Sequence, residues 1–328
     1  MKKLIVLATL AALPAAAMAD VVISGNLAVG ITNTKVSGTG SYNTNDRTSG
    51  ELKFAGKEDL GNGLKSIWQI ATRINLTDTP ADGKNNNWSS RESFVGLTGD
   101  FGTLKLGNLY HMPTSGAMAI FEDNSATFES SIYDTGDYTN SSISYKTPSV
   151  AGFTATVQHS FGPQDSDNTV GSSAAAEKAK KHQQAVSLAY EGEGFSVSYD
   201  GKRAKVDDAN DNKTHELNAS VSLDALTLMA GYARQTTEAA GVATKRNGYG
   251  IAASYAMGNI TPKFGFWREG DSKTDGVSTD NGHKAYALGV EYALSKRTRA
   301  GVEFAKANFD DADTGDKRTA TVYLGTKF

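Results

Sequence analysis

The segment "RTATVYLGTKF", Arg318–Phe328, is a sequence with a period of two. The more apolar side chains share one parity: Ala320, Val322, Leu324, Thr326 and Phe328. The more polar ones share the other: Thr319, Thr321, Tyr323, Gly325 and Lys327. This alternation predicts a β-strand with one apolar and one polar face. The strand reaches Phe328 with no polar tail, so the protein must have a use for an aromatic residue at the end of an amphipathic strand.

The same alternation recurs along the chain, at 21–31, 214–223, 247–257 and 283–294. A Tyr lies near each end of 247–257 and of 283–294, and we find no convincing segment of helical period. The 34 Gly, 13 Tyr, 13 Phe and only 6 Pro suit many strands joined by turns. The sequence therefore predicts an all-β protein.

The predicted connections alternate between two kinds. Seven are tight, at 59–63, 99–102, 149–152, 191–194, 223–225, 258–259 and 295–298. Eight are long and polar, at 35–46, 77–90, 109–138, 162–181, 204–213, 236–245, 269–282 and 308–316. These fifteen connections predict sixteen strands, with all long connections at one end.

The two strand faces indicate two different surroundings. The polar face carries Gly, Ala, Ser, Thr, Asn, Lys and Glu and suits water, whereas the apolar face with its aromatic ends suits lipid. Backbone groups in lipid have no water partners, so the sheet must close. We therefore predict a 16-stranded antiparallel transmembrane β-barrel with short periplasmic turns and long extracellular loops.

The N-terminal residues predict export. A positive start (Met1–Lys3) is followed by an apolar stretch and by the small-x-small site Ala17–Ala19, the arrangement of a signal peptide. We expect residues 1–19 to be cleaved and 20–328 to form the barrel. Loss of two lysines would change the net charge from −3 to −5, which does not favour nucleic-acid binding.

Five stretches, in order, resemble a known family: the trimeric general porins of Gram-negative bacteria, most like the neisserial-type, beta-proteobacterial branch. The stretches are "MADVVISGNLAVGI", "GELKFAGKEDLGNGLKSIWQI", "SRESFVGLTGDFGTLKLGN", "NSSISYKTPSVAGFTATVQHSFG" and "YLGTKF". The resemblance implies a channel in the bacterial outer membrane for passive diffusion of small hydrophilic solutes and ions. It also implies a homotrimer packed through the lipid-facing side of the first few and last strands. Lipopolysaccharide, the lipid bilayer and the barrel assembly machinery are the other implied partners, and Phe328 would be the assembly signal.

The resemblance implies that the longest connection, 109–138, folds into the barrel and narrows it. This range contains no Lys or Arg, and its acids are Glu122, Asp123, Glu129, Asp134 and Asp137. In the mouth of a narrow pore, such a charged ring selects ions by sign. Alternatively, the range is a solvated acidic surface loop.

Porins of this family place basic residues on the wall that faces the acidic loop. The candidates here are Arg73, Arg91, Lys146, Lys53 and Arg47. Lys146 keeps the charge of a wall arginine but loses its planar fork. Glu51 and Asn108 stand where the family usually has arginine, which weakens any case for strong anion selectivity. The alternative role of these charges is merely to solvate the lumen.

Two residues break the expected parity. Glu92 shares a side with Phe94, and His159 shares one with Val157 and Phe161. We expect Glu92 at the trimer interface and His159 near the outer headgroups, unless either marks a bulge.

Residue patterns for catalysis and metal binding are absent from the sequence. The five His are scattered, Cys is absent and no GxxxxGK[ST] phosphate loop occurs, so we predict no enzyme, catalytic residue, metal or cofactor. Two alternatives to a diffusion channel stay open. A substrate-selective channel would need an aromatic ladder, for which only Tyr323 and Trp267 are inward candidates, and a barrel adhesin would not conduct.

Overall fold

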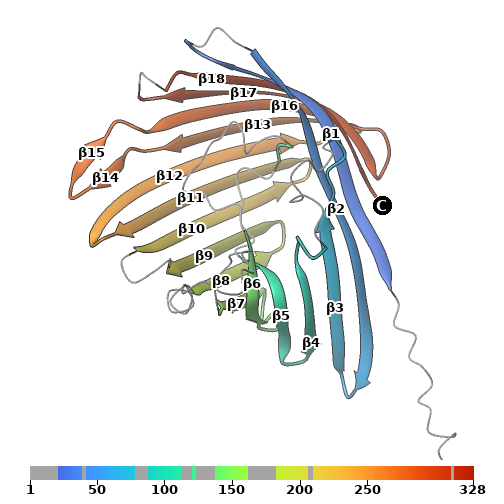
Figure 1. Ribbon diagram of the computed structural model, residues 1–328. Coiled ribbons are helices and arrows are strands. Elements are labelled where there is room, and N and C mark those ends of the chain that lie inside the picture. The colour runs from blue at the N-terminus through green and yellow to red at the C-terminus, as the bar shows by residue number, and fades with distance from the viewer. Residues whose placement is uncertain are drawn as a thin grey trace, which may run out of the picture.

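The computed structural model describes residues 21–38, 42–77, 88–111, 120–122, 137–161, 182–205, 210–311 and 314–328, with backbone alone at 42, 43, 45–47, 111 and 137. These residues form one antiparallel sheet of 18 strands that curves into a barrel wall (Figure 1). The strands are β1 Val22–Val36, β2 Tyr42–Gly61, β3 Leu64–Arg73, β4 Ser93–Gly99, β5 Gly102–His111, β6 Asp137–Lys146, β7 Phe153–Ser160, β8 His182–Gly192, β9 Phe195–Lys205, β10 Asn210–Leu223, β11 Leu226–Ala239, β12 Val242–Tyr255, β13 Ile260–Glu269, β14 Ser272–Thr274, β15 Val277–Thr279, β16 His283–Ala293, β17 Thr298–Phe309 and β18 Lys317–Lys327. Among the described residues, no helix is long and apolar enough to cross a membrane.

The sheet closes on itself through its first and last strands. β1 pairs with β18 from Asn26↔Lys327 to Val36↔Lys317, and with β2 along its other edge. β13 pairs directly with β16, and the short β14–β15 hairpin extends the sheet beyond the end of β13, where β14 pairs with β12 (Figure 1). The other strands of the described chain form a closed barrel of sixteen, which confirms the predicted fold. Closure leaves no unpaired strand edge facing lipid.

All seven predicted tight turns lie between consecutive strands. The β2–β3 turn is Gly61–Gly63, in which all three residues have positive φ (89°, 53° and 77°). Glycine adopts this conformation without a steric penalty, and Asn tolerates it better than most residues.

One predicted long loop is wrong. β11 continues to Ala239 and β12 begins at Val242, so the connection within 236–245 is the turn Ala240–Gly241. Similarly, β10 begins at Asn210, inside the loop predicted at 204–213. The polar residues of these segments suggested loops because a strand that projects into water has the same composition as a loop.

The predicted alternation of faces is confirmed in β18. Val322 and Leu324 are 59% and 50% exposed on the outer surface, whereas Thr321 and Tyr323 are buried on the inner one. Phe328 follows this strand, and its N–H and C=O groups both bond to Gly25 of β1 at 3.1 Å.

A small apolar core lies on the inner surface of the wall. The Trp267 side chain is fully buried there, between the Phe121 ring and alanines of neighbouring strands. These alanines are Ala233, Ala252, Ala285, Ala287 and Ala307. A Cβ on Gly250 would lie 2.3 Å from the Trp267 ring, so only glycine leaves room for the indole. Ile120 and Phe121, from within the predicted constriction range, therefore pack against the inner wall.

Candidate pore site

The basic wall begins with a cluster on β2 and β3. Lys53 forms an ion pair with Glu51 (Nζ to Oε1, 3.0 Å), and Arg73 is the direct cross-strand neighbour of Glu51. All three residues share the inner face, as their parity predicted. Glu51 thus offsets part of the positive charge of Lys53 and Arg73 at the position where the family usually has arginine. Of Arg47, the structure describes the backbone, which pairs with Gly30.

Glu92 belongs to the lumen and not to a trimer interface, so that expectation is wrong. Its Oε1 lies 3.2 Å from Nζ of Lys105, and the same Nζ lies 4.2 Å from the centre of the Phe94 ring. Phe94 pairs with Gln69 on the inner face, while Val95, 64% exposed, takes the outer face. The sequence-based error was to assume that Phe94 faces lipid. Lys105 is a lumenal cation that sequence reasoning missed, although its alternation with Leu104 and Leu106 was a usable signal.

Arg91 is held in place through both its side chain and its backbone. The guanidinium carbon lies 5.2 Å from the centre of the Tyr138 ring, which is cation–π distance. The Arg91 N–H donates to the Ala71 carbonyl at 3.2 Å. Asn108 donates its side-chain amide to the Arg91 carbonyl at 3.0 Å. Asn108 therefore replaces an expected wall charge and at the same time fixes the backbone that carries Arg91.

Lys146 lines a pocket on the inner wall with a volume of about 410 Å³. Glu92 and Lys105 line the same pocket, together with the neutral side chains of Ser144 and Thr156. Three charges of mixed sign among hydroxyl groups form a hydrated surface rather than a dense cationic ring. His159, by contrast, lies on the outer face near the loop end of β7, opposite Ile143 and with its ring 4.6 Å from that of Phe161.

The predicted acidic residues are described only in part. Asp137 is the first residue of β6, where its backbone pairs with His111. Asp123, Glu129 and Asp134 lie outside the described residues.

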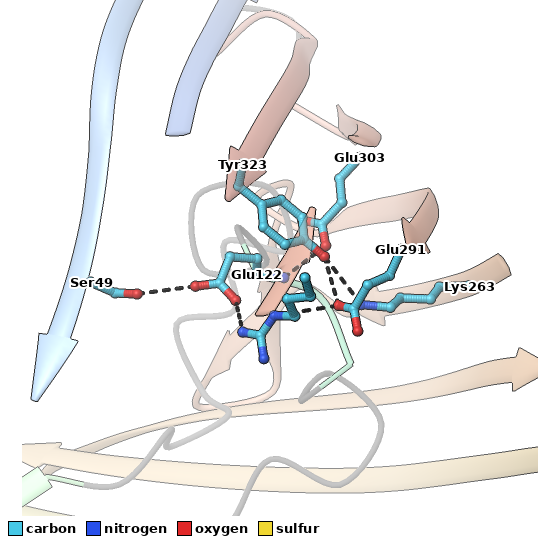
Figure 2. Close-up of polar contacts among 7 residues, drawn as sticks. Ser49, Glu122, Lys263, Glu291, Glu303 and Tyr323 are labelled. Atoms are coloured by element: carbon cyan, nitrogen blue, oxygen red, sulfur yellow. Dashed lines mark hydrogen bonds and ion pairs between the residues drawn. The ribbon is translucent and has the colours of Figure 1, made fainter. Parts of the chain in front are cut away.

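Glu122 is held at three points against the inner wall (Figure 2). Ser49 donates its hydroxyl to Oε1 at 3.0 Å, and Arg299 donates Nη2 to Oε2 at 2.6 Å. The Glu122 N–H donates to Oε1 of Glu303 at 2.8 Å. Both carboxylate oxygens are engaged and the side chain is only 14% exposed. Glu122 is therefore an anchor that ties the segment 120–122 to β2 and β17.

Glu291 connects this anchor to two further strands. Its Oε2 accepts hydrogen bonds from Lys263 at 3.0 Å and from the Tyr323 hydroxyl at 2.8 Å, and lies 3.5 Å from Nε of Arg299 (Figure 2). Three acids (Glu122, Glu291 and Glu303) and two bases (Lys263 and Arg299) thus meet from four segments of the chain, so the cluster holds one more acid than base. Sequence reasoning missed Arg299, Lys263 and Glu291. Their inward parity was visible, but nothing local indicated that they meet Glu122.

A closed sixteen-stranded barrel with an apolar outside, a charged inner wall and an inward-packed segment defines an outer-membrane channel of the porin class. The family model described as Gram-negative porin matches residues 5–328, and the chain belongs to that family. It is thus a general diffusion porin of the outer membrane, a channel and not an enzyme.

Curated relatives and solved structures agree with this assignment. The chain is similar to the major outer membrane protein P.IB of Neisseria lactamica, with 31% identity over 92% of this chain and 91% of that protein. The corresponding protein of Neisseria gonorrhoeae is 28% identical, over 92% of each chain. In fold, the chain is similar to the anion-selective porin from Comamonas acidovorans, with a TM-score of 0.75, 21% identity and coverage of 94% and 100%. Salmonella typhi OmpF gives a TM-score of 0.71 at 18% identity, with coverage of 94% and 98%.

Proposed function

We propose that small hydrophilic solutes and ions pass through a constriction between the basic wall of β2–β6 and the loop range 109–138. The wall contributes Lys53, Arg73, Arg91, Lys105 and Lys146, with Arg47 nearer the loop end. The loop contributes Asp123, Glu129, Asp134 and Asp137, with Glu122 as its anchor. Opposed charges of this kind create a transverse field in which water and polar solutes are favoured over apolar ones.

The observation that supports this proposal best is the three-point attachment of Glu122. A segment in the middle of the longest predicted connection is bonded to β2 and β17 on the lumen side. An attachment on the lumen side supports the proposal that the range 109–138 narrows the open cross-section of the barrel. We propose that residues 1–19 are removed on export and that the mature barrel needs no cofactor.

Charge on the wall indicates a weak preference among ions. Five cations on β2–β6 are offset by Glu51 and Glu92, and two of the cations are directly paired with these acids. The remaining surplus of positive charge on the wall is small, and the acidic residues of the loop range offset part of it. A substrate-selective channel is less well supported, because Tyr323 and Trp267 are 3% and 0% exposed and offer solutes no aromatic ladder.

We further propose a homotrimer, packed through the outer faces of β1–β3 and β18. These faces carry exposed apolar side chains such as Ile23 and Ile31, which are 58% and 63% exposed in the single chain. One related fold, OmpT of Vibrio cholerae, has been solved in a trimer form. Lipopolysaccharide and the bilayer would surround the trimer. Phe328, at the junction where β18 pairs with β1, would be the signal that the assembly machinery recognises.

Conductance in a planar bilayer tests the proposal directly. We expect stepwise openings in groups of three and a small reversal potential in a salt gradient. The variant Arg73→Gln should shift that potential toward cation preference, because it removes a wall cation, while Arg234→Gln on the outer face should not. A folded, inserted barrel that does not conduct would favour the adhesin alternative, and equal effects of the two variants would remove the basic wall from the mechanism.

A further inference from the structure

The inner-wall pocket on β5–β8, about 410 Å³ in volume, contains one available cation and one fixed acid. Lys146 makes no side-chain hydrogen bond or ion pair within the described part of the chain. Glu92 is held at two points, because Gln69 donates Nε2 to its carbonyl oxygen at 2.7 Å and Lys105 lies 3.2 Å from its Oε1. The other carboxylate oxygen of Glu92, Oε2, accepts no hydrogen bond from the described residues. The pocket therefore offers a ligand one positive and one negative group.

Strand register places these two groups in neighbouring rows across the wall. Lys105 lies directly opposite Ser144 of β6, and Lys146 follows two residues later on the same strand. Lys105 and Lys146 are thus diagonal neighbours, with Cα atoms about 7–8 Å apart. Because Glu92 is bonded to Lys105, its carboxylate belongs to the first row, whereas the Lys146 side chain extends from the second. A ligand that spans both rows would need two opposite charges close together.

The first row also contains a neutral acceptor. Gln158 lies directly opposite Ser144 and donates Nε2 to Oγ1 of Thr139 at 2.7 Å. The Thr139 hydroxyl gives its own hydrogen to the Leu109 carbonyl at 3.2 Å. That hydroxyl can therefore only accept from Gln158, which leaves the Gln158 side-chain carbonyl oxygen available to accept from a ligand.

The second row contains a neutral donor. Thr156 lies directly opposite Lys146 and lines the same pocket. Its hydroxyl makes no hydrogen bond within the described residues and can rotate to donate. Lys146 and Thr156 together can bind a carboxylate, and hydrogen bonds to an ionised group are stronger than neutral ones. One row of the pocket thus accepts hydrogen bonds and the other donates them.

We propose that this pocket binds a small zwitterion, an amino acid or a dipeptide, on its way through the channel. The carboxylate of the solute would bind to Lys146 and Thr156, and its ammonium group to Oε2 of Glu92 and Oε1 of Gln158. The volume of about 410 Å³ is near the lower end for small-molecule pockets, which suits a solute of this size. The inference rests on the proposed passage of small hydrophilic solutes and adds a substrate class to it.

A solute with a single charge fits the pocket less well. A simple anion would find one available cation, since Lys105 is already paired with Glu92. It would also lie near the Glu92 carboxylate, and like charges side by side reduce affinity. A simple cation would meet Lys146 in the same way. A zwitterion satisfies both rows.

Ion current through the channel in a planar bilayer tests the inference, because a bound solute reduces the current. Glycylalanine should do so at about tenfold lower concentration than N-acetylalanine, which lacks the ammonium group, or glycylalaninamide, which lacks the carboxylate. Lys146→Gln should weaken the effects of glycylalanine and N-acetylalanine about tenfold, and Lys146→Arg should restore both to within about threefold. Glu92→Gln should weaken glycylalanine about tenfold while N-acetylalanine binds as well as before or more tightly.

Lys53→Gln and Glu51→Gln are matched controls, because they make the same charge changes on the inner wall outside this pocket. Four strand spacings of about 4.8 Å along the wall separate β2 from β6, which exceeds the Debye length of about 10 Å in 0.1 M salt. Both controls should therefore leave glycylalanine binding within about twofold, although they change the ion preference of the channel.

Two results would overturn the inference. Equal weakening by Lys53→Gln and Lys146→Gln would indicate diffuse attraction to the whole lumen. Equal binding of glycylalanine and N-acetylalanine, unaffected by Glu92→Gln, would indicate a simple anion site. Saturation-transfer NMR of glycylalanine with the full-length protein in detergent detects the same binding without any current. A conducting barrel that binds no dipeptide would refute the zwitterion site alone, and a barrel that binds the dipeptide without conducting would refute the proposed function alone.

Discussion

The anchor at Glu122 gives the sharpest prediction, the effect of Arg299→Gln. Arg299 bonds Oε2 of Glu122 at 2.6 Å and lies 3.5 Å from Glu291, and the side chains of Arg299 and Glu122 are 31% and 14% exposed. A hydrogen bond between charged groups contributes roughly 1.5–3 kcal/mol. Partial exposure of Arg299 reduces this contribution through solvent screening, so we expect about 1.5–2 kcal/mol for the Glu122 contact.

Amide hydrogen exchange at Glu122 measures this contribution, because its N–H is bonded to Glu303 in the anchored segment. A loss of about 1.5–2 kcal/mol corresponds to exchange that is roughly tenfold to thirtyfold faster. The single-channel current should become noisier, since the segment 120–122 would leave the wall more often. Lys306→Gln is the matched control, because it removes an ion pair on the outer face.

A double-mutant cycle isolates the pair. Glu122→Gln and Arg299→Gln should each speed exchange, and the double variant should be less affected than the sum of the two, with a coupling of about 1 kcal/mol or more. Additive effects, or unchanged protection in Arg299→Gln, would refute the anchor and with it the role of Glu122 as a fixed point of the constriction.

Three further variants test other parts of the structure. Glu51→Gln should shift the reversal potential toward anions, because it removes the acid paired with Lys53, and no shift would mean that Glu51 lies outside the ion path. Gly25→Ala should lower the folded fraction on unheated gels, because its Cβ would lie 2.5 Å from the Glu51 carbonyl and 2.6 Å from the Phe328 ring; Gly325→Ala, with its nearest contact at 3.5 Å, is the control that should fold normally. The hydrogen bonds from Arg268 hold the pKa of the Asp310 carboxyl, at the loop end, below its usual range. The pair therefore stabilises the folded state above about pH 4, and this contribution disappears as the pH falls through the lower folded-state pKa. Melting temperatures of Asp310→Asn and the unaltered protein should accordingly differ at pH 6 and converge toward pH 3; a constant difference would contradict the assignment.

Much of the barrel could be predicted from local sequence. A strand that separates water from lipid must alternate, and the alternation in β18 correctly placed Tyr323 inside and Val322 outside. The tight turns were also predictable, since Gly and Asn mark positions of positive φ such as Gly61–Gly63. Parity alone also predicted that Lys53 and Arg73 share the inner face of the sheet.

Predictions failed where composition was ambiguous. Residues 236–245 are polar whether they form a loop or a projecting hairpin, and only pairing between β11 and β12 distinguishes the two. Phe94 was assumed to face lipid because it is aromatic, but it lies on the inner face. Glu92 has the same parity as Phe94, so the prediction placed Glu92 on the wrong face as well. In both cases a property of single residues was used to decide a question of strand pairing.

The sequence by itself determined the class of the protein, because the alternation of apolar and polar residues within each strand indicates which face meets lipid and which meets water. Only the tertiary structure decided how the lumen is arranged. Glu122 meets Arg299 and Glu303 about 180 residues further along the chain, and Arg318 meets Lys35 only because the barrel closes. Such contacts depend on register across many strands, and register is set by the closed hydrogen-bond network rather than by any one segment.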